Sequence, residues 1–273
     1  MFSPDRLNPT DAAILETFVV PRYLSLFGEL ALEMLSVGES GRLLHVGCRT
    51  GYPDLALLER FENLEIVGVD PSLSAIELAR HKAALRREAP IEYRVEESLP
   101  GELEPGVFTH ALALHPILPD SQRGELFSAL RWLMSAGGQA LVGLPLRGSF
   151  QEIADLLREY ALKYEESEFL KALEVSLAIR PSIETISEEL EAAGFEDIDV
   201  EVRQASLSFE SGRAFVEDPT TRLLILPEIR TWIPNSDLTR PLDYAREAID
   251  KYWSEGKLEL TLNVGCASAR CPL

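Results

Sequence analysis

Short apolar segments of strand length alternate with segments of helical periodicity along the first half of the chain, and this alternation limits the fold more than any other sequence feature. The strand-like segments are Leu43–Val46, Leu64–Val69, Ile91–Val95, Phe108–Leu114 and Ala140–Leu144. Strands that alternate with helices form parallel βαβ units with right-handed connections. The sequence therefore predicts an α/β fold with a doubly wound, mostly parallel sheet and helices on both faces.

Helical patterns precede and follow this alternation. The first covers Thr10–Glu16, and a second begins at Pro21, because proline fits the first turn of a helix. A later helix from Asp120 to Ser135 is expected to end at Gly137, since glycine is preferred just beyond helix ends. These patterns predict that strand and helix boundaries fall at prolines and glycines.

The last third of the chain contains two further segments of period two, 195–202 and 258–264, which predict two additional strands. A stretch with helical patterns and several prolines separates them. We expect four parts: an N-terminal helical cap (1–38), a core (39–205), a helical insertion or lid (206–253), and the final strand with the C-terminal tail (254–273).

Charge and cysteine content narrow the function. The formal net charge is −19, which disfavours DNA or RNA as a partner because phosphate backbones would be repelled. No apolar run is long enough to span a membrane, and the N-terminus lacks the pattern of a secretory signal. The three cysteines fit neither a full disulfide set nor a zinc site. We expect an acidic, cytoplasmic, metal-free protein.

A glycine-containing loop and an acidic residue form the pattern of a nucleoside-binding site. The loop, Gly47–Gly51, follows the first predicted strand, and Asp70 closes the second strand 19 residues beyond Gly51. Glycine lets the backbone approach a ligand, the helix N-terminus presents free N–H groups, and the carboxylate accepts ribose hydroxyls. Nicotinamide-binding domains share this pattern.

Five segments, in order, resemble motifs of the class I S-adenosylmethionine-dependent methyltransferases, in particular type 11-like methyltransferase domains. Leu43–Tyr52 resembles the LDVGCGTG motif, and Val67–Ser72 resembles the second motif. The strand Phe108–His115, the Gly-Gly segment Leu133–Leu141 and the Ala-Gly-Phe segment Ile186–Phe195 are similar to the later motifs. The resemblance implies a seven-stranded Rossmann-like sheet with an antiparallel last strand, and S-adenosylmethionine as cofactor.

The resemblance also implies a set of site residues. Gly47, Cys48 and Gly51 would contact the methionine and ribose portion, Asp70 the ribose hydroxyls, and Glu96 the adenine. Leu114 and His115 would lie beneath the sulfonium, and His115 is the candidate catalytic residue. The full cofactor-binding set is Gly47, Cys48, Arg49, Gly51, Asp70, Pro71, Glu96 and Leu114.

Three positions depart from the family pattern. His45 stands where the first motif has an acid, Arg49 replaces its middle glycine, and Thr109 replaces an aspartate. The Arg49 guanidinium either points to solvent, intrudes where the cofactor lies, or pairs with the cofactor carboxylate. His45 in place of a carboxylate would remove a hydrogen bond that braces the loop.

Three functions are compatible with these residues to different degrees. The first is S-adenosylmethionine-dependent methyl transfer to a small molecule. The second is a catalytically degenerate methyltransferase fold that acts as a binding or scaffolding protein for a protein partner. The third, a nicotinamide-dependent oxidoreductase, requires a G-x-G-x-x-G run that the chain lacks. Methyl transfer needs no catalytic dyad, because the sulfonium is already activated and positioning suffices.

Overall fold

The computed structural model describes residues 6–86, 89–116, 118, 120–232 and 237–273, so the predicted cap, core and insertion each contain a few residues outside the described part. Contacts divide the chain into two compact units. Unit 1 consists of Met1–Leu144, Ile183–Val202 and Gly265–Leu273, and unit 2 of Pro145–Ser182 and Arg203–Val264. The four-part division expected from the sequence stays a prediction.

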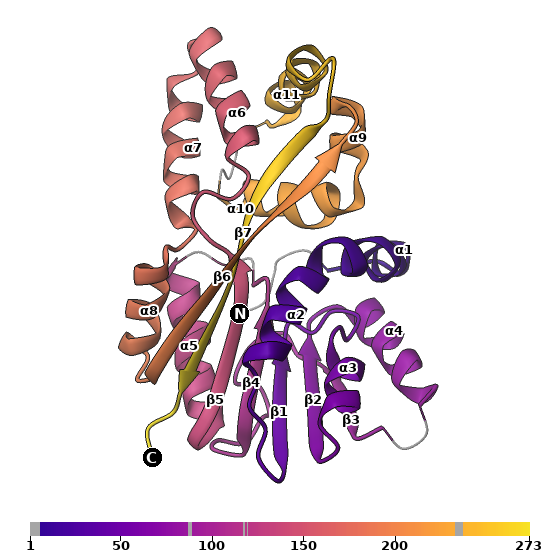
Figure 1. Cartoon of the computed structure of the whole chain (residues 1–273), viewed down its shortest axis with the longest axis vertical. Helices are drawn as coiled ribbons and strands as arrows, with labels where there is room; N and C mark the ends of the chain where they lie inside the picture. Colours follow the sequence, from indigo (N-terminus) through magenta and orange to yellow (C-terminus); the bar gives the residue numbers. More distant parts are fainter. Residues whose placement is uncertain (1–5, 87–88, 117, 119, 233–236) are drawn as a thin grey trace. The chain divides into compact units, whose positions relative to one another are not determined.

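Seven strands form one sheet in the order β3-β2-β1-β4-β5-β7-β6 (Figure 1). The neighbours from β3 to β5 are parallel. Apolar side chains fill these strands, and the central ones are buried along nearly their whole length, as expected of a sheet covered on both faces. The doubly wound, mostly parallel sheet is confirmed. The strands are β1 (Gly41–Val46), β2 (Leu64–Asp70), β3 (Ile91–Val95), β4 (Phe108–Leu114), β5 (Met134–Pro145), β6 (Glu196–Phe209) and β7 (Leu258–Arg270).

The last strand runs antiparallel to its neighbour β5. The N–H of Cys271 donates to the carbonyl of Gly138 at 2.8 Å, while the N–H of Leu146 donates to the carbonyl of Asn263 at 2.9 Å. Residue numbers rise along β5 as they fall along its partner, which is the antiparallel arrangement. The orientation expected for the final strand is therefore correct.

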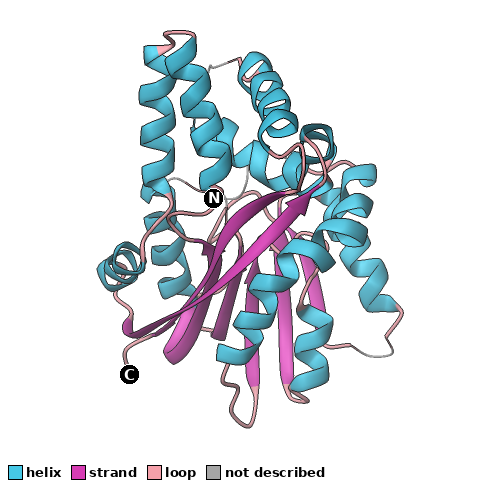
Figure 2. Ribbon diagram, turned by 45° about the horizontal axis from the view of Figure 1, so that its top comes forward, coloured by secondary structure: helices cyan, strands magenta, loops and turns pink. Residues whose placement is uncertain are grey.

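The helices of unit 1 lie on both faces of its strands (Figure 2). Helices α3 and α4 follow β1 and β2 and pack near β2 and β3, whereas α5 packs against α8. None of the helices in the described part of the chain is long and apolar enough to cross a membrane. The helical segments of unit 1 are α1 (Pro9–Ile14), the π-helical η1 (Leu15–Leu24), α2 (Ser25–Met34), α3 (Asp54–Arg60), α4 (Leu73–Ala84), α5 (Asp120–Leu133) and α8 (Ile183–Ala192).

Unit 2 is mostly helical and includes the ends of β6 and β7. Helix α6 packs against α7 and α11, and α11 also contacts α9. The apolar face of α6 carries Ile153, Leu157 and Tyr160 inward, at the spacing of an amphipathic helix. Its helical segments are α6 (Gln151–Lys163), α7 (Ser167–Ile179), α9 (Gly212–Glu217), the π-helical η2 (Thr221–Ile225), α10 (Leu226–Trp232) and α11 (Thr239–Tyr252).

The chain does not begin a new helix at Pro21, and this expectation was wrong. Pro21 lies inside η1, and helical structure runs without a break from Pro9 to Met34. The wider π-type turn breaks the regular i→i−4 ladder, so it accommodates a residue that has no N–H to donate.

Strand β5 begins earlier than the sequence indicates. The expected strand started at Ala140, whereas the structure extends β5 back to Met134, through Gly137 and Gly138. Both glycines pair with Cys271, because the Gly137 N–H donates to the Cys271 carbonyl at 3.1 Å. Pairing with a distant strand therefore overrides the helix-ending preference of the glycines.

Candidate functional site

The loop Gly47–Gly51 connects β1 to α3 and folds back on β2. The Cys48 N–H donates to the Val69 carbonyl at 3.1 Å, and the Gly51 N–H donates to the Cys48 carbonyl at 2.8 Å. Gly47 has a φ of 64°, and a Cβ added there would meet no heavy atom within 4 Å. Glycine thus leaves open space beside the backbone at the start of the loop.

Asp70 lies at the end of β2 with its carboxylate turned toward this loop. Oδ2 accepts the N–H of Arg49 at 3.0 Å, and Oδ1 accepts the N–H of Ser72 at 2.8 Å. Burial raises the pKa of the Asp70 carboxyl above its ordinary value, while these hydrogen bonds and the Arg49 charge act in the opposite direction. A carboxylate oxygen can accept two hydrogen bonds, so each oxygen retains capacity for a ligand hydroxyl.

The side chain of Arg49 extends from the loop to the end of β4. Its two terminal nitrogens donate to the carbonyls of Leu114 at 2.8 Å and of His115 at 2.9 Å. Burial lowers the pKa of the guanidinium and the Asp70 charge opposes this, but arginine remains a cation. The structure therefore brings together Arg49, Asp70, Leu114 and His115, which are far apart in the sequence.

His115 is buried just beyond β4 and contacts the N-terminal helices. Its Nε2 lies 2.8 Å from the hydroxyl of Tyr23, and its ring packs edge-on against Phe27. The backbone of His115 has a φ of 50°, which is uncommon for a residue other than glycine. Tyr23 was not identified from the sequence, because a single tyrosine in an apolar helix gives no signal of such a contact.

Two residues of the loop, Cys48 and Gly51, lie against the buried side chains beneath it. The Cys48 thiol packs with Ile76, Ala79 and Tyr93, and burial together with the Asp70 charge raises its pKa. A Cβ at Gly51 would lie only 2.3 Å from the Tyr93 hydroxyl oxygen. Close packing against Tyr93 is therefore a reason for glycine at position 51, in addition to its predicted contact with the ligand.

Pro71 and Glu96 lie beside Asp70. Pro71 follows it directly and is partly exposed, and the Glu96 N–H donates to the Asp70 carbonyl at 3.2 Å. The Glu96 carboxylate sits against Gly101, where an added Cβ would come within 2.6 Å of Oε2. The cofactor roles of both residues stay predictions.

A buried polar cluster, absent from the predicted set, lies below the loop. His45 Nδ1 is 2.6 Å from Asp54 Oδ1, and the Tyr93 hydroxyl donates to Asp54 Oδ2 at 2.9 Å. The substitution at position 45 was apparent in the sequence, but the other two members of the cluster are nine and 48 residues away. Nothing in the local sequence indicates that they meet.

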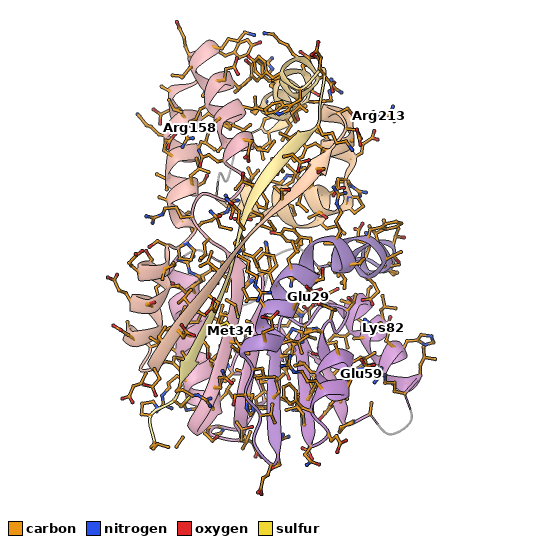
Figure 3. The ribbon with its side chains drawn as sticks, in the orientation of Figure 1. Glu29, Met34, Glu59, Lys82, Arg158 and Arg213 are labelled. Atoms are coloured by element: carbon orange, nitrogen blue, oxygen red, sulfur yellow. The ribbon has the colours of Figure 1, made fainter. Side chains whose placement is uncertain are left out.

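The N-terminal helices are tied to the loop through Lys82, a residue of α4 that is labelled in Figure 3. Lys82 Nζ donates to Glu16 Oε1 at 2.6 Å and to the Thr50 carbonyl at 3.0 Å. The Ser72 hydroxyl also donates to the Leu7 carbonyl at 3.0 Å. These contacts connect η1 with the glycine loop, and the residues just before α1 with the turn after Asp70.

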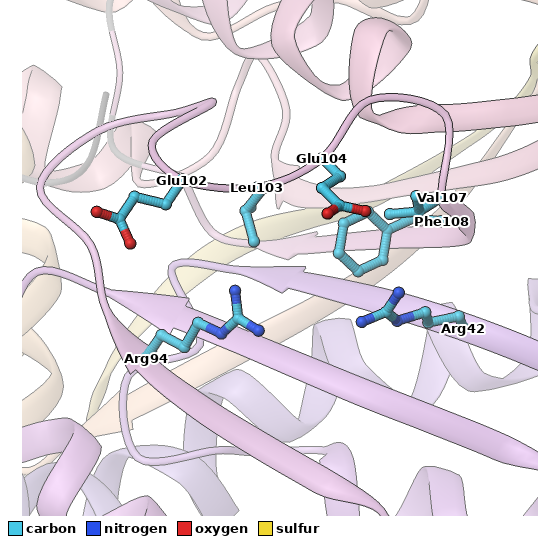
Figure 4. A pocket seen from close by; sticks show the side chains of 7 residues that line it. All are labelled: Arg42, Arg94, Glu102, Leu103, Glu104, Val107 and Phe108. Atoms are coloured by element: carbon cyan, nitrogen blue, oxygen red, sulfur yellow. The ribbon is translucent and has the colours of Figure 1, made fainter.

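A cavity of about 170 Å³ lies under the loop that enters β4 (Figure 4). Arg42 and Arg94 face it from the sheet, and Glu102 and Glu104 face it from the loop. Arg94 is paired with Glu92, whose Oε1 lies 2.7 Å from Arg94 Nε. None of the predicted site residues lines this cavity.

Part of the chain matches a known protein family. A family model described as a methyltransferase domain matches residues 43–138, which include the glycine loop, Asp70, Leu114 and His115. No curated protein sequence matches the chain.

Solved structures share the fold at low sequence identity. Phosphoethanolamine N-methyltransferase 2 of Haemonchus contortus, in complex with phosphomonomethylethanolamine and S-adenosylhomocysteine, aligns with a TM-score of 0.57 at 19% identity. The alignment covers 97% of this chain but only 58% of that enzyme. The [4+2]-cyclase SpnF aligns with a TM-score of 0.53 at 18% identity over 90% of this chain and 80% of the cyclase.

A third similar structure is a complex between the Haloferax volcanii Trm112 methyltransferase activator and a putative methyltransferase. It aligns with a TM-score of 0.52 at 14% identity, covering 97% of this chain and 96% of the matched chain. Likeness at these identities concerns the fold. The family model matches residues 43–138, and the solved structures show that the chain shares the fold of methyltransferases.

Proposed function

We propose that the protein transfers a methyl group from S-adenosylmethionine to a small molecule. The observation that carries the proposal is the buried carboxylate of Asp70, which faces the glycine loop and keeps capacity for further hydrogen bonds. A nucleoside sugar needs an acceptor of this kind at the end of the second strand. The methyltransferase-domain match over residues 43–138 supports the same cofactor.

The residues present fit S-adenosylmethionine. Open space beside Gly47 lets a ligand approach the backbone, and Asp70 offers acceptors to ribose hydroxyls. Arg49 uses two of its five N–H donors on the carbonyls of Leu114 and His115, so others remain for the cofactor carboxylate. We infer that Arg49 serves the bound cofactor by this pairing. The roles of Cys48, Gly51, Pro71, Glu96 and Leu114 follow from the family resemblance.

The cofactor would supply a methyl group already activated by its sulfonium. The protein must then position the substrate and accept its proton. His115, with its ring nitrogen against the Tyr23 hydroxyl, is the group in this part of the site best suited to hold that proton. The contact with the Tyr23 hydroxyl would orient the His115 ring, and through it the end of β4.

Two further assignments belong to the proposal. The N-terminal helices would cap the site, which is supported by the Lys82 contacts to Glu16 and Thr50 and by the Tyr23–His115 contact. The insertion 206–253 would form a lid that excludes water from the substrate. A small-molecule substrate agrees with the Haemonchus contortus structure, whose ligand is a small phosphate ester.

Calorimetric titration with S-adenosylhomocysteine tests the proposal directly. The wild-type protein should bind, and Asp70→Ala should weaken binding by at least about 100-fold, because it removes a charged acceptor from a buried site. Wild-type protein that gives no heat at millimolar ligand would contradict the proposal. The Lys171→Met variant, at an exposed pair with Glu168 in α7, provides a control that should bind normally.

The second candidate is a degenerate methyltransferase fold that binds a protein partner. The observation favouring it is the Arg49 guanidinium, which already occupies the carbonyls at the end of β4. Arg49→Gly separates the two candidates. Weaker binding of S-adenosylhomocysteine is expected, since the pairing with the ligand carboxylate is lost; tighter binding would mean that the side chain obstructs the site.

A further inference from the structure

The side chain at the β1 position where the family pattern has an acid contacts a carboxylate from another element. His45 occupies the expected position, and its Nδ1 lies 2.6 Å from Oδ1 of Asp54 in α3. Both side chains are almost completely excluded from solvent, at 1% and 0% exposure. A carboxylate buried to this extent needs hydrogen-bond donors around it.

Tyr93 of β3 supplies the second donor to the same carboxylate. Its hydroxyl donates to Asp54 Oδ2 at 2.9 Å, so each oxygen of Asp54 has its own partner. Burial and the Asp54 charge raise the pKa of the Tyr93 hydroxyl, which keeps the donor protonated. The cluster His45–Asp54–Tyr93 thereby joins β1, α3 and β3.

The glycine loop lies between two members of this cluster. His45 precedes Gly47 by two residues, and Asp54 follows Gly51 by three. Tyr93 fills the space under the loop, since a Cβ at Gly51 would lie 2.3 Å from its hydroxyl oxygen and a Cβ at Gly68 2.5 Å from its ring. The cluster therefore fixes both ends of the loop and supports it from below.

We propose that His45, Asp54 and Tyr93 act as positioning residues for the cofactor, with Asp54 supplying the carboxylate that the first motif lacks at position 45. They would act through the loop, by holding the Arg49 N–H against Asp70 and the backbone of Gly47 beside the open space. This inference rests on the proposed function for its ligand, but the network itself does not depend on a ligand.

Side-chain geometry allows the proposal to be tested by exchanging the groups. Nδ1 of histidine and the terminal atoms of aspartate and asparagine are all two bonds from Cβ, so they reach similar positions. His45→Asp restores the family residue but sets two carboxylates against each other in a buried site. In the double variant His45→Asp/Asp54→Asn, the new amide at position 54 would donate to the new carboxylate at position 45. The oxygen of that amide would accept from Tyr93, which satisfies every group.

Binding of S-adenosylhomocysteine at pH 8 should follow this pattern. We expect His45→Asp to bind at least about tenfold more weakly than wild type, because a buried polar contact is broken. His45→Asn, which keeps a donor toward Asp54, and the double variant should both bind within about threefold of wild type. If Asp54 did not replace the missing acid at position 45, His45→Asp alone would restore that acid and strengthen binding.

Hydrogen exchange of the loop without ligand gives a readout independent of cofactor binding. The amides of Cys48 and Gly51 are hydrogen-bonded in the structure, and they should exchange at least about tenfold faster in His45→Asp than in wild type or the double variant. His110→Asp serves as a control, since this buried β4 histidine bonds to Thr109 and Ser36 instead. It should lower thermal stability without changing ligand affinity.

The outcomes separate this inference from the proposed function. Unchanged affinity and loop exchange in His45→Asp, or failure of both His45→Asn and the double variant to restore them, would overturn the inference. A wild-type protein that does not bind S-adenosylhomocysteine would overturn the proposed function, whereas the exchange data would still test the network. If His45→Asp does not fold, rescue by the double variant to wild-type affinity decides the question.

Discussion

Two glycines of unit 1, Gly51 and Gly68, lie against the ring of Tyr93. The phenol group stands so close to both backbones that a methyl group at either position would overlap it. At Gly51 the backbone also has a φ of 80°, a conformation that side-chain-bearing residues adopt at a cost. The residue types at positions 51, 68 and 93 are therefore physically coupled.

Gly51→Ala should destabilise the protein by about 1–3 kcal/mol, from left-handed backbone strain and the clash with the tyrosine oxygen. Urea unfolding of wild type, both single variants and Gly51→Ala/Tyr93→Phe measures the coupling. Tyr93→Phe removes the nearest clashing atom and leaves Cζ at 2.8 Å from the added Cβ, so Gly51→Ala should cost less in that background. Strictly additive costs would contradict this coupling.

A useful comparison is Gly47→Ala, at the other end of the loop. An added Cβ there meets open space, so only the backbone cost of about 1 kcal/mol is expected. A cost as large as that of Gly51→Ala would indicate that backbone strain alone, and not the ring, governs both positions.

At this scale the sequence identifies the positions of the site better than their contacts. Asp70 and Arg49 were predicted to lie in one site, and the structure brings them together. The sequence also reveals that His45 and Thr109 are unusual. It cannot reveal that Asp54 lies against His45, or that the Thr109 hydroxyl accepts the N–H of Arg42, because such contacts depend on how distant elements pack.

At the scale of elements, a buried ion pair links α7 and α10 in unit 2. Arg180 follows α7, and its Nε lies 2.7 Å from Glu228 Oε1 of α10, while another of its nitrogens donates to the Ser149 carbonyl. The guanidinium also stacks 4.9 Å from the centre of the Phe150 ring. Arg180 thus joins the end of α7 to α10 and to the residues just before α6.

Glu228→Ala should destabilise the protein by about 3–5 kcal/mol, because it leaves an unpaired charge in a buried site. Arg158→Met is the matched control, since Arg158 pairs with Glu174 on the exposed face of the α6–α7 helices (Figure 3). That variant should cost less than about 1 kcal/mol. Thermal or urea unfolding compares the two; equal costs would show that the Arg180 pair is not effectively desolvated.

The sequence predicted which strands and helices exist in the core, but not every residue at which they begin and end. The alternation of apolar strands and amphipathic helices predicts the order of elements because each helix must cover the sheet. The start of β5 depends on pairing with Cys271, which lies more than 130 residues away. The π-helical segment around Pro21 buries Tyr23 and its neighbours, and local propensity does not describe it.

At the scale of the whole molecule, negative charge dominates. The chain has 45 acidic and 26 basic residues, giving a net charge of −19. Mutual repulsion of like charges opposes compaction, and dissolved salt screens this repulsion with a Debye length of about 8 Å at physiological ionic strength.

The melting temperature should therefore rise as sodium chloride increases from about 10 to 300 mM, since screening relieves repulsion over this range. Differential scanning calorimetry at fixed pH measures the effect. Potassium chloride should act in the same way, because screening does not depend on the identity of a monovalent cation. A flat or falling melting temperature would mean that attractive ion pairs outweigh the net repulsion.

The Arg49 guanidinium places a permanent positive charge at the end of β4. A cofactor seated there as proposed would carry a second positive charge on its sulfur before the reaction and none afterwards. Electrostatics would then favour the spent molecule over the fresh one. An enzyme built in this way would be slowed by its own by-product, and its rate in the cell would follow how quickly that by-product is cleared.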